Sequence, residues 1–158
     1  MAKKGTIVFE EVGTSGPETQ ATLLRVIQEK EFTSLGSNEV IKVDVRILAA
    51  TNADLRRMVE ERKFREDLYY RLNVVQLQIP PLRERRDDIQ LLLSGFLATF
   101  AAQYQMPRPT VSPEAMDGLM THAWPGNVRE LKNVAERLVV SGLIRHIEVG
   151  ELPAELLD

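Results

Sequence analysis

Two short apolar runs, each ending abruptly in polar side chains, constrain the fold of this chain most. The first, TIVF at residues 6–9, is followed by Glu10 and Glu11. The second lies in VDVRILAA at residues 43–50, where Val43, Val45 and Ile47 alternate with charged residues before an apolar end that leads to Asn52. Short apolar runs rich in β-branched residues are typical of buried strands in a parallel sheet. The carboxyl ends of such strands lie at one sheet edge, where α/β proteins bind ligands. The sequence therefore predicts an α/β fold with these polar groups at one edge.

Between and after these runs, the pattern alternates between helix and strand. Gly16-Pro17 indicates a helix start because proline is tolerated at the first helical position. A hairpin is predicted around residues 36–38, and further helical turns follow at residues 55–59 and 64–72. The alternating segment VVQLQI then predicts a third strand, which stops at Pro80-Pro81 because proline cannot continue a hydrogen-bonded ladder. Residues 1–82 thus form the predicted α/β part.

The remaining residues, 83–158, have a helical period and predict an all-α bundle. One helix begins near Asp87, and a second begins at Ser112-Pro113, with serine as the N-cap. A third follows Asn127, which we expect to be an N-cap, with Glu130 in the position of a capping box.

Composition excludes several classes of function. The net charge is −3, so a surface devoted to nucleic acid is not expected. The chain has no cysteine and no apolar run long enough to span a membrane, which favours a cytoplasmic location. His122 and His146 are far apart and share no helical spacing with acids, so no zinc site is predicted.

The polar groups at the two strand ends match the needs of phosphoryl transfer. That chemistry uses a carboxylate near Mg²⁺, a second carboxylate that orients the attacking water, and a polar amide near the γ-phosphate. Glu10, Glu11 and Asn52 could supply these groups. The alternative is that they are hydrated strand ends without a catalytic role.

Three arginines could bind phosphate, although each has a plainer interpretation. Arg65 and Arg71 are six residues apart, about 600° around a helix, so they point roughly 120° apart and cannot form one clamp. They could reach two parts of a phosphate cluster, or pair locally with Glu66 or Asp67. Arg129 is expected in the first turn of a helix, where the macrodipole disfavours a cation unless an anion is near. A salt bridge to an acid of the bundle is the alternative for Arg129.

Five blocks of sequence carry a family resemblance. They are LLRVIQEKEF, VDVRILAATNADL, FREDLYYRLNV, PPLRERRDDI and WPGNVRELKN. In this order and spacing the chain resembles the central ATPase domain of NtrC-type, sigma-54-dependent transcriptional activators (bacterial enhancer-binding proteins), from Gly5 to about Pro153. The resemblance implies a partial P-loop NTPase fold of the AAA+ type, with a parallel-sheet core followed by a helical lid.

The same resemblance implies roles for individual residues. The first strand resembles a Walker B motif in which Glu11 is the catalytic glutamate, and Glu10 replaces the aspartate that usually serves Mg²⁺. Asn52 matches the sensor I residue. Arg65 and Arg71 match arginine fingers that act on the nucleotide of a neighbouring subunit, and Arg129 matches sensor II. Residues 35–39 resemble a loop that faces the substrate.

Two family motifs are not found in these residues: the phosphate-binding loop G-x-x-x-x-G-K-[ST] and the GAFTGA loop that contacts sigma-54. The resemblance therefore implies a fragment that begins after both motifs and ends before a DNA-binding domain. Its parent would bind ATP and Mg²⁺, assemble as a hexameric ring and remodel sigma-54 RNA polymerase. The fragment alone is expected to be inactive as an ATPase, with exposed apolar surface that favours self-association.

Two alternatives belong to other classes of function. The chain could be a non-enzymatic modulator that docks on intact homologues and offers them Arg65 and Arg71. It could also be a helix-turn-helix DNA-binding module at residues 112–140, which the low isoelectric point of about 5.5 argues against.

Overall fold

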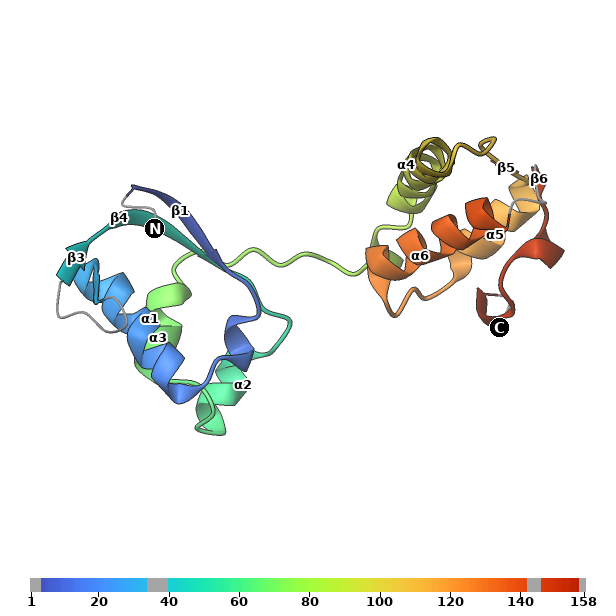
Figure 1. Cartoon of the computed structure of the whole chain (residues 1–158). Coiled ribbons are helices and arrows are strands. Elements are labelled where there is room, and N and C mark those ends of the chain that lie inside the picture. Colours follow the sequence, from blue (N-terminus) through green and yellow to red (C-terminus); the bar gives the residue numbers. More distant parts are fainter. Residues whose placement is uncertain (1–3, 34–39, 142–145, 157–158) are drawn as a thin grey trace. The chain divides into compact units, whose positions relative to one another are not determined.

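The chain forms two compact units, Met1–Leu77 and Gln78–Asp158. A computed structural model describes residues 4–33, 40–141 and 146–156 (Figure 1). The division between the units falls a few residues before the boundary at residue 82 that the sequence predicts.

The first unit contains the predicted parallel pair of strands. Strand β1 (Lys4–Phe9) pairs with β4 (Asp44–Ala49), and Phe9 lies opposite Ala49 in the register. Helix α1 (Pro17–Glu29) lies between them in the sequence, as a parallel connection requires. Its N-cap is Gly16, with Pro17 at the first helical position, as predicted.

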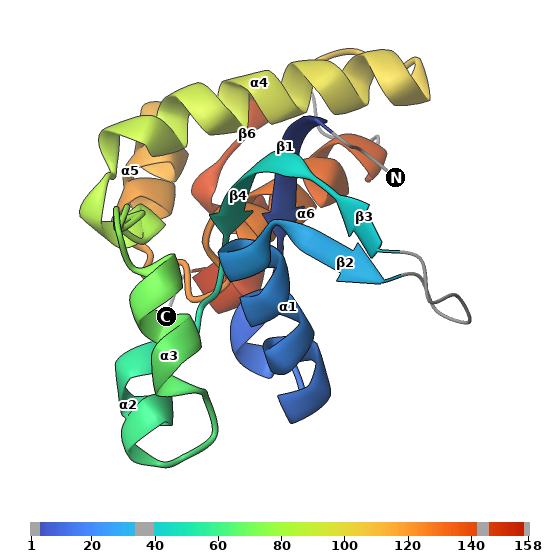
Figure 2. The same ribbon diagram turned by 90° about the vertical axis from the view of Figure 1, so that its left-hand side faces the viewer.

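The predicted hairpin is also present. Strands β2 (Glu31–Thr33) and β3 (Val40–Lys42) pair in antiparallel register, and Figure 2 shows the two arms side by side. Residues 35–39, which resemble a substrate-facing loop, lie outside the described residues.

Two further helices complete the first unit: α2 (Leu55–Glu60) and α3 (Glu66–Leu72). Together with α1 they form a small core that is separate from the core of the second unit. Its buried residues are Val12, Leu23, Leu24, Phe64 and Leu68.

The prediction that both strands are buried on two faces is wrong. Val8 is 55% exposed and Leu48, its partner in the register, is exposed as well. Ile7 and Ile47 are only half-exposed, so exposure alternates along the strands as it does when one face is covered. The reason is that the described sheet has only two strands, and α1 and α3 lie on one side of it (Figure 1).

The third predicted strand is also absent from the described structure. Residues 74–80 form no ladder, and Leu77 is 87% exposed. An alternating apolar pattern does not form a strand without a neighbouring strand that accepts its hydrogen bonds. In the described part of the chain this segment has no such neighbour.

The second unit is a bundle of three helices, as predicted. These are α4 (Asp87–Tyr104), α5 (Pro113–Thr121) and α6 (Asn127–Val140), preceded by the 3₁₀ turn η2 (Leu82–Glu84). The fully buried side chains of its core include Leu82, Ile89, Leu93, Leu119, Trp124, Leu131, Val134 and Ile147.

Two side-chain hydrogen bonds stabilise the bundle around α5. The Ser112 hydroxyl accepts a hydrogen bond from the Ala115 N–H at 3.1 Å, which confirms the predicted cap of α5. The Trp124 indole N–H donates to the carbonyl oxygen of Leu119 at 2.8 Å, so the buried ring has no unpaired polar atom.

A short parallel pair in the bundle was not predicted. Strands β5 (Thr110–Val111) and β6 (His146–Ile147) are two residues each, too short to leave a recognisable pattern in the sequence. The 3₁₀ turns η3 (Val149–Glu151) and η4 (Ala154–Leu156) follow them. Among the described helices, none is both long and apolar enough to cross a bilayer.

Replacing Leu93 with alanine is expected to lower the free energy of unfolding of the second unit by about 2–5 kcal/mol, because a buried leucine is replaced by a cavity. Leu91 is 76% exposed on the same helix and provides the control, for which Leu91→Ala should change stability by less than about 0.5 kcal/mol. Urea unfolding followed by the fluorescence of Trp124 measures both. Equal effects of the two variants would contradict the assigned core.

Candidate functional site

Glu10 and Glu11 occupy the turn in which the chain leaves the parallel sheet. The Ala50 N–H donates to the Phe9 carbonyl at 2.8 Å, and the Val12 N–H donates back to the Ala50 carbonyl at 3.1 Å. Glu10 and Glu11 therefore lie, along the chain, between the two residues that bond to Ala50 just beyond the strand ends. Both residues are exposed, and in the described part of the chain neither carboxylate makes a hydrogen bond or an ion pair.

The backbone at Glu11 is held in the left-handed region, with φ of 55°. The Thr14 N–H and the Thr14 hydroxyl both donate to the Glu11 carbonyl, at 2.9 and 2.8 Å. A non-glycine residue in this region is uncommon and depends on its surroundings. The 3₁₀ turn η1 (Val12–Thr14) thus fixes the direction of the chain at Glu11.

Asn52 is held beside this turn by a close contact at Gly13. A Cβ atom at Gly13 would lie 2.8 Å from the Thr51 hydroxyl oxygen and 2.9 Å from the Ala53 Cβ, so only glycine fits without a shift. The Thr51 hydroxyl accepts a hydrogen bond from the Ala53 N–H at 3.1 Å, and Asn52 is exposed between them. Our sequence interpretation passed over Gly13, although a glycine just after two strand-end acids was the available signal.

The donor set at this edge fits Mg²⁺ only in combination with another ligand. No group of three or more His, Cys, Asp or Glu side chains suited to a metal occurs among the described residues. Mg²⁺ is commonly held by one or two carboxylates together with phosphate oxygens and water. Glu10 and Glu11, exposed and unpaired in the described structure, match that kind of shared site.

Arg65 lies just before helix α3 rather than within it. It is the N-cap residue, with extended backbone, so the helical angle between Arg65 and Arg71 expected from the sequence does not apply. The Arg65 guanidinium makes two hydrogen bonds to Asp67, with Nε–Oδ1 at 3.0 Å and Nη2–Oδ2 at 2.7 Å. This is the local pairing that the sequence left open as the alternative.

Arg71 has a different environment. It is exposed in the last turn of α3 and makes no hydrogen bond or ion pair within the described residues. Arg71 could therefore bind another molecule without losing an ion pair, whereas Arg65 would first have to give up its bonds to Asp67.

The pair of Arg65 and Asp67 changes the acidity of both groups. Hydrogen bonding from the Arg65 guanidinium holds the pKa of the Asp67 carboxyl below its usual value. The Asp67 carboxylate likewise raises the pKa of the Arg65 guanidinium. Both side chains are about half exposed, so the pair contributes little stability.

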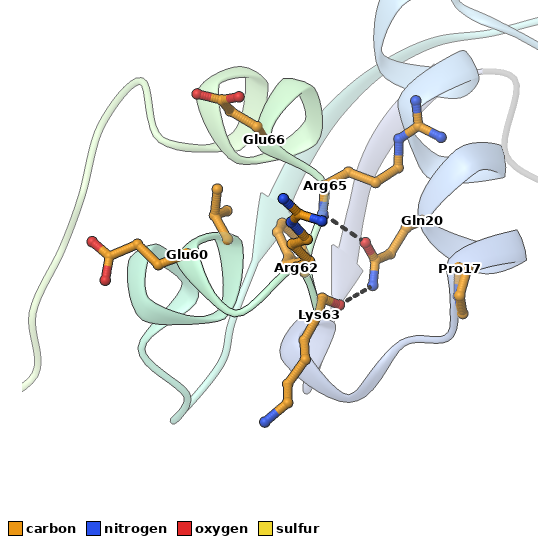
Figure 3. Close-up of a pocket in the computed structure, with 9 residues that line it drawn as sticks. Pro17, Gln20, Glu60, Arg62, Lys63, Arg65 and Glu66 are labelled. Carbon is orange, nitrogen blue, oxygen red and sulfur yellow. Dashed lines mark hydrogen bonds between the residues drawn. The ribbon is translucent and has the colours of Figure 1, made fainter.

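A pocket of about 410 Å³ adjoins Arg65 (Figure 3). Its wall carries basic and acidic side chains together with the almost fully buried side chain of Gln20. The lining residues are Pro17, Gln20, Val59, Glu60, Arg62, Lys63, Phe64, Arg65 and Glu66. The sequence analysis missed Gln20, because a polar residue on an amphipathic helix carries no signal of burial.

In the second unit, Arg129 is exposed in the first turn of α6. The salt bridge to an acid of the bundle, which the sequence offered as an alternative, is not found among the described residues. Nothing in the described structure therefore neutralises this cation near the helix N-terminus, where the macrodipole disfavours it.

The prediction that Asn127 caps α6 is wrong. The N-cap is Gly126, and the Asn127 side-chain oxygen instead accepts a hydrogen bond from the Leu82 N–H at 2.8 Å. Leu82 is fully buried, so its backbone N–H requires a partner inside the protein. The Glu130 carboxylate accepts from the Gly126 N–H at 2.7 Å, so it still contributes to the helix start.

Comparison with known families decides the identity of this fold. The family described as "Sigma-54 interaction domain" matches residues 1–78, and "AAA+ ATPase lid domain" matches residues 83–158. The chain belongs to the sigma-54 interaction family. It carries part of an AAA+ fold, with an α/β unit followed by a helical lid, as its resemblance to sigma-54-dependent activators predicts.

This chain has relatives that are regulatory proteins. It is 48% identical to the regulatory protein AtoC of Escherichia coli over 155 residues, which is 98% of this chain and 34% of AtoC. It is 51% identical over 137 residues to the Nif-specific regulatory protein of Herbaspirillum seropedicae, covering 87% of this chain and 25% of that protein. The chain thus spans about a third or less of these relatives.

Solved structures of NtrX from Brucella abortus share the fold. The ADP complex has a TM-score of 0.88 at 39% identity and covers 96% of this chain and 35% of NtrX. The ATP complex has a TM-score of 0.86 at 38% identity and covers 94% and 36%. NtrX thus binds ADP and ATP, and about a third of its chain shares the fold of the present chain.

Replacing Arg65 with glutamine should raise the pKa of the Asp67 carboxyl toward its usual value, because the charged hydrogen bonds that depress it are lost. The pairing is present above the usual carboxyl pKa and disappears as pH falls through the depressed pKa. NMR titration of the carboxyl carbon measures the shift. Arg71→Gln is the control and should leave Asp67 unchanged, whereas equal shifts in both variants would contradict the pair.

Replacing Asn127 with alanine should destabilise the second unit by about 1–3 kcal/mol, because the buried Leu82 N–H loses its acceptor. Asn127→Asp retains an acceptor oxygen and tolerates the left-handed backbone, so it should cost less than half as much. Urea unfolding measures both variants. If aspartate is as destabilising as alanine, the hydrogen bond to Leu82 is not the reason for the loss.

Proposed function

We propose that this chain is the second half of an ATPase domain from a sigma-54-dependent activator, acting in the cytoplasm. With the part that supplies the phosphate-binding loop, it would couple ATP hydrolysis in a ring oligomer to remodelling of sigma-54 RNA polymerase and so activate transcription. The observation that carries this proposal is the register of Phe9 with Ala49, from which Glu11 and Asn52 emerge at one sheet edge. The ADP- and ATP-bound NtrX structures, which share this fold, support it.

In this proposal each polar group at the edge has one task. Glu11, fixed by its backbone in the turn, orients the attacking water, and Asn52 contacts the γ-phosphate. Glu10 would hold Mg²⁺ together with phosphate oxygens, and the ion would neutralise charge on the transferring phosphoryl group. Because Glu10 is one methylene longer than aspartate, Glu10→Asp should alter Mg²⁺ affinity in an assembled domain.

The arginines act on nucleotide from outside the sheet edge. Arg65 and Arg71 would reach the nucleotide of a neighbouring subunit and stabilise charge that develops in the transition state. Arg71 is available at once, whereas Arg65 must exchange its bonds with Asp67 for bonds to phosphate. Arg129, at the start of a helix without a neutralising partner in the described structure, would contact the bound nucleotide from the lid.

A second candidate function rests on the free guanidinium of Arg71 and the exposed sheet face of Val8 and Leu48. The chain by itself could dock on an intact homologue as a non-enzymatic modulator. We do not propose the helix-turn-helix alternative, since residues 83–158 match an AAA+ lid. Direct contact with DNA is therefore not part of the proposed function.

A chimera tests the proposed ATPase role. The segment of AtoC that is similar to this chain is replaced by the chain itself, and phosphate release is followed with malachite green. We expect the chimera to hydrolyse ATP, and Glu11→Gln to lower its kcat at least roughly 100-fold, because the residue that orients water is lost. Glu18→Gln removes an exposed carboxylate on α1 and should have no effect. Full activity of Glu11→Gln would refute the role of Glu11.

The chain without a fusion partner separates the two candidate functions. It contains no G-x-x-x-x-G-K-[ST] sequence among its residues, so its phosphate release should remain at background. Titrating it into intact AtoC and measuring the ATPase rate tests the modulator. No change at saturating concentration would dismiss that second candidate.

A further inference from the structure

Gln20 is a buried polar residue whose amide nitrogen and amide oxygen are both hydrogen-bonded. It is 2% exposed and lies on helix α1. Its Nε2 donates to the Ser15 carbonyl at 2.8 Å and to the Lys63 carbonyl at 3.1 Å. Its Oε1 accepts from the Arg65 N–H at 2.9 Å. Figure 3 shows this side chain directed at the backbone of Lys63 and Arg65.

These bonds join two segments that are distant in the sequence. Ser15 follows the turn η1, which begins next to Glu11 and is bonded to the end of β4 through the Val12 N–H. Lys63 and Arg65 belong to the loop that leads into α3. Gln20 therefore connects the turn after Glu11 to the backbone of Arg65 through a single side chain.

The loop before α3 depends on this side chain at Arg65. Lys63 and Phe64 are held by their own N–H groups, which donate to the Met58 carbonyl at 2.8 and 3.2 Å. Arg65 is the N-cap residue, and the only bond made by its N–H among the described residues is the one to Gln20. Arg62 has a left-handed backbone with φ of 57°, so this loop adopts a strained path that its contacts must maintain.

Apolar packing alone does not require glutamine at this position. The neighbouring core residues Phe64 and Leu68 supply the buried surface, and a methionine would fill a similar volume. A buried amide is favourable only when its partners are in place, and then it defines one geometry. The three bonds thus specify where the Arg65 backbone lies, beyond keeping the unit folded.

We propose that Gln20 is a positioning residue that holds Arg65 in register with the turn after Glu11. This inference rests on the proposed function, in which Glu11 serves the nucleotide of its own subunit and Arg65 that of a neighbour. A shift of the turn beside Glu11 is transmitted by Gln20 to the Arg65 backbone. Gln20 therefore couples the conformation at the nucleotide site of one subunit to the position of the Arg65 that reaches the nucleotide site of the neighbouring subunit.

The first test uses the chain itself and measures amide hydrogen exchange by NMR. In Gln20→Met the Arg65 amide should exchange at least about ten-fold faster, because it loses its acceptor. The Tyr69 amide, which donates to the Arg65 carbonyl at 3.0 Å, should change much less. Gln28→Met replaces an exposed glutamine of the same helix and is the matched control. An unchanged Arg65 amide in Gln20→Met would overturn the proposal.

If Gln20→Met unfolds the first unit, a second variant tests the proposal instead. Gln20→Glu keeps an acceptor for the Arg65 N–H but, when ionised, donates to neither carbonyl. Protonation of the new carboxyl restores one donor, so protection of the Arg65 amide should increase as pH falls. Protection that does not respond to pH in this variant would count against the proposal.

The second test is a double-mutant cycle in the AtoC chimera. Gln20→Met should lower kcat roughly 10- to 100-fold with little change in the KM for ATP, as expected when a catalytic group is slightly misplaced. In an Arg65→Ala background the same change should lower kcat less than about two-fold, because Gln20 acts through Arg65. A residue with only a general structural role would lower kcat equally in both backgrounds, which would overturn the proposal.

The two proposals fail in different ways. If Arg65→Ala leaves the kcat of the chimera unchanged, the proposed role of Arg65 is wrong whatever the exchange data show. If Arg65→Ala lowers kcat but Gln20→Met does not, the proposed function stands and the positioning role of Gln20 is refuted.

Discussion

The first unit depends on the parallel pairing of two strands in one register. Because Phe9 lies opposite Ala49, the chain segments that follow both strands leave the sheet at the same level. Hydrogen bonds between Val12 and Ala50, and the close contact of Gly13 with Thr51, extend this alignment beyond the strands. A slip of one residue would turn each side chain to the opposite face. The candidate site is therefore a consequence of register rather than of a preformed cavity.

Two amide side chains, one buried and one half-buried, accept hydrogen bonds from backbone N–H groups next to the candidate arginines. In the first unit Gln20 accepts from the Arg65 N–H. In the second unit Asn127, the first residue of the helix that carries Arg129, accepts from the Leu82 N–H. Each side chain joins segments more than forty positions apart in the chain. Amides suit this task because they satisfy backbone groups in a fixed direction, which apolar packing does not do.

The sequence predicted most elements correctly where the pattern was long or strongly marked. Pro17 and Ser112 marked helix starts, and the apolar period of α4 and α6 predicted their buried faces. The prediction failed for residues 74–79, where an alternating pattern without a strand partner remains exposed. It failed as well for the buried character of β1 and β4, because burial depends on what covers the sheet and is not contained in the strand itself.

The sequence by itself determined the order of the helices and of the strands β1 to β4, the family, and the residues that carry charge at the strand ends and near α3 and α6. These features follow from local composition and spacing, which a chain displays without folding. Only the tertiary structure decided that Arg65 pairs with Asp67, that Asn127 bonds to Leu82 rather than capping its helix, and that Gln20 is buried beneath Arg65. Each of these depends on which distant or neighbouring group satisfies a polar atom, and that choice is made only when the backbone is in place.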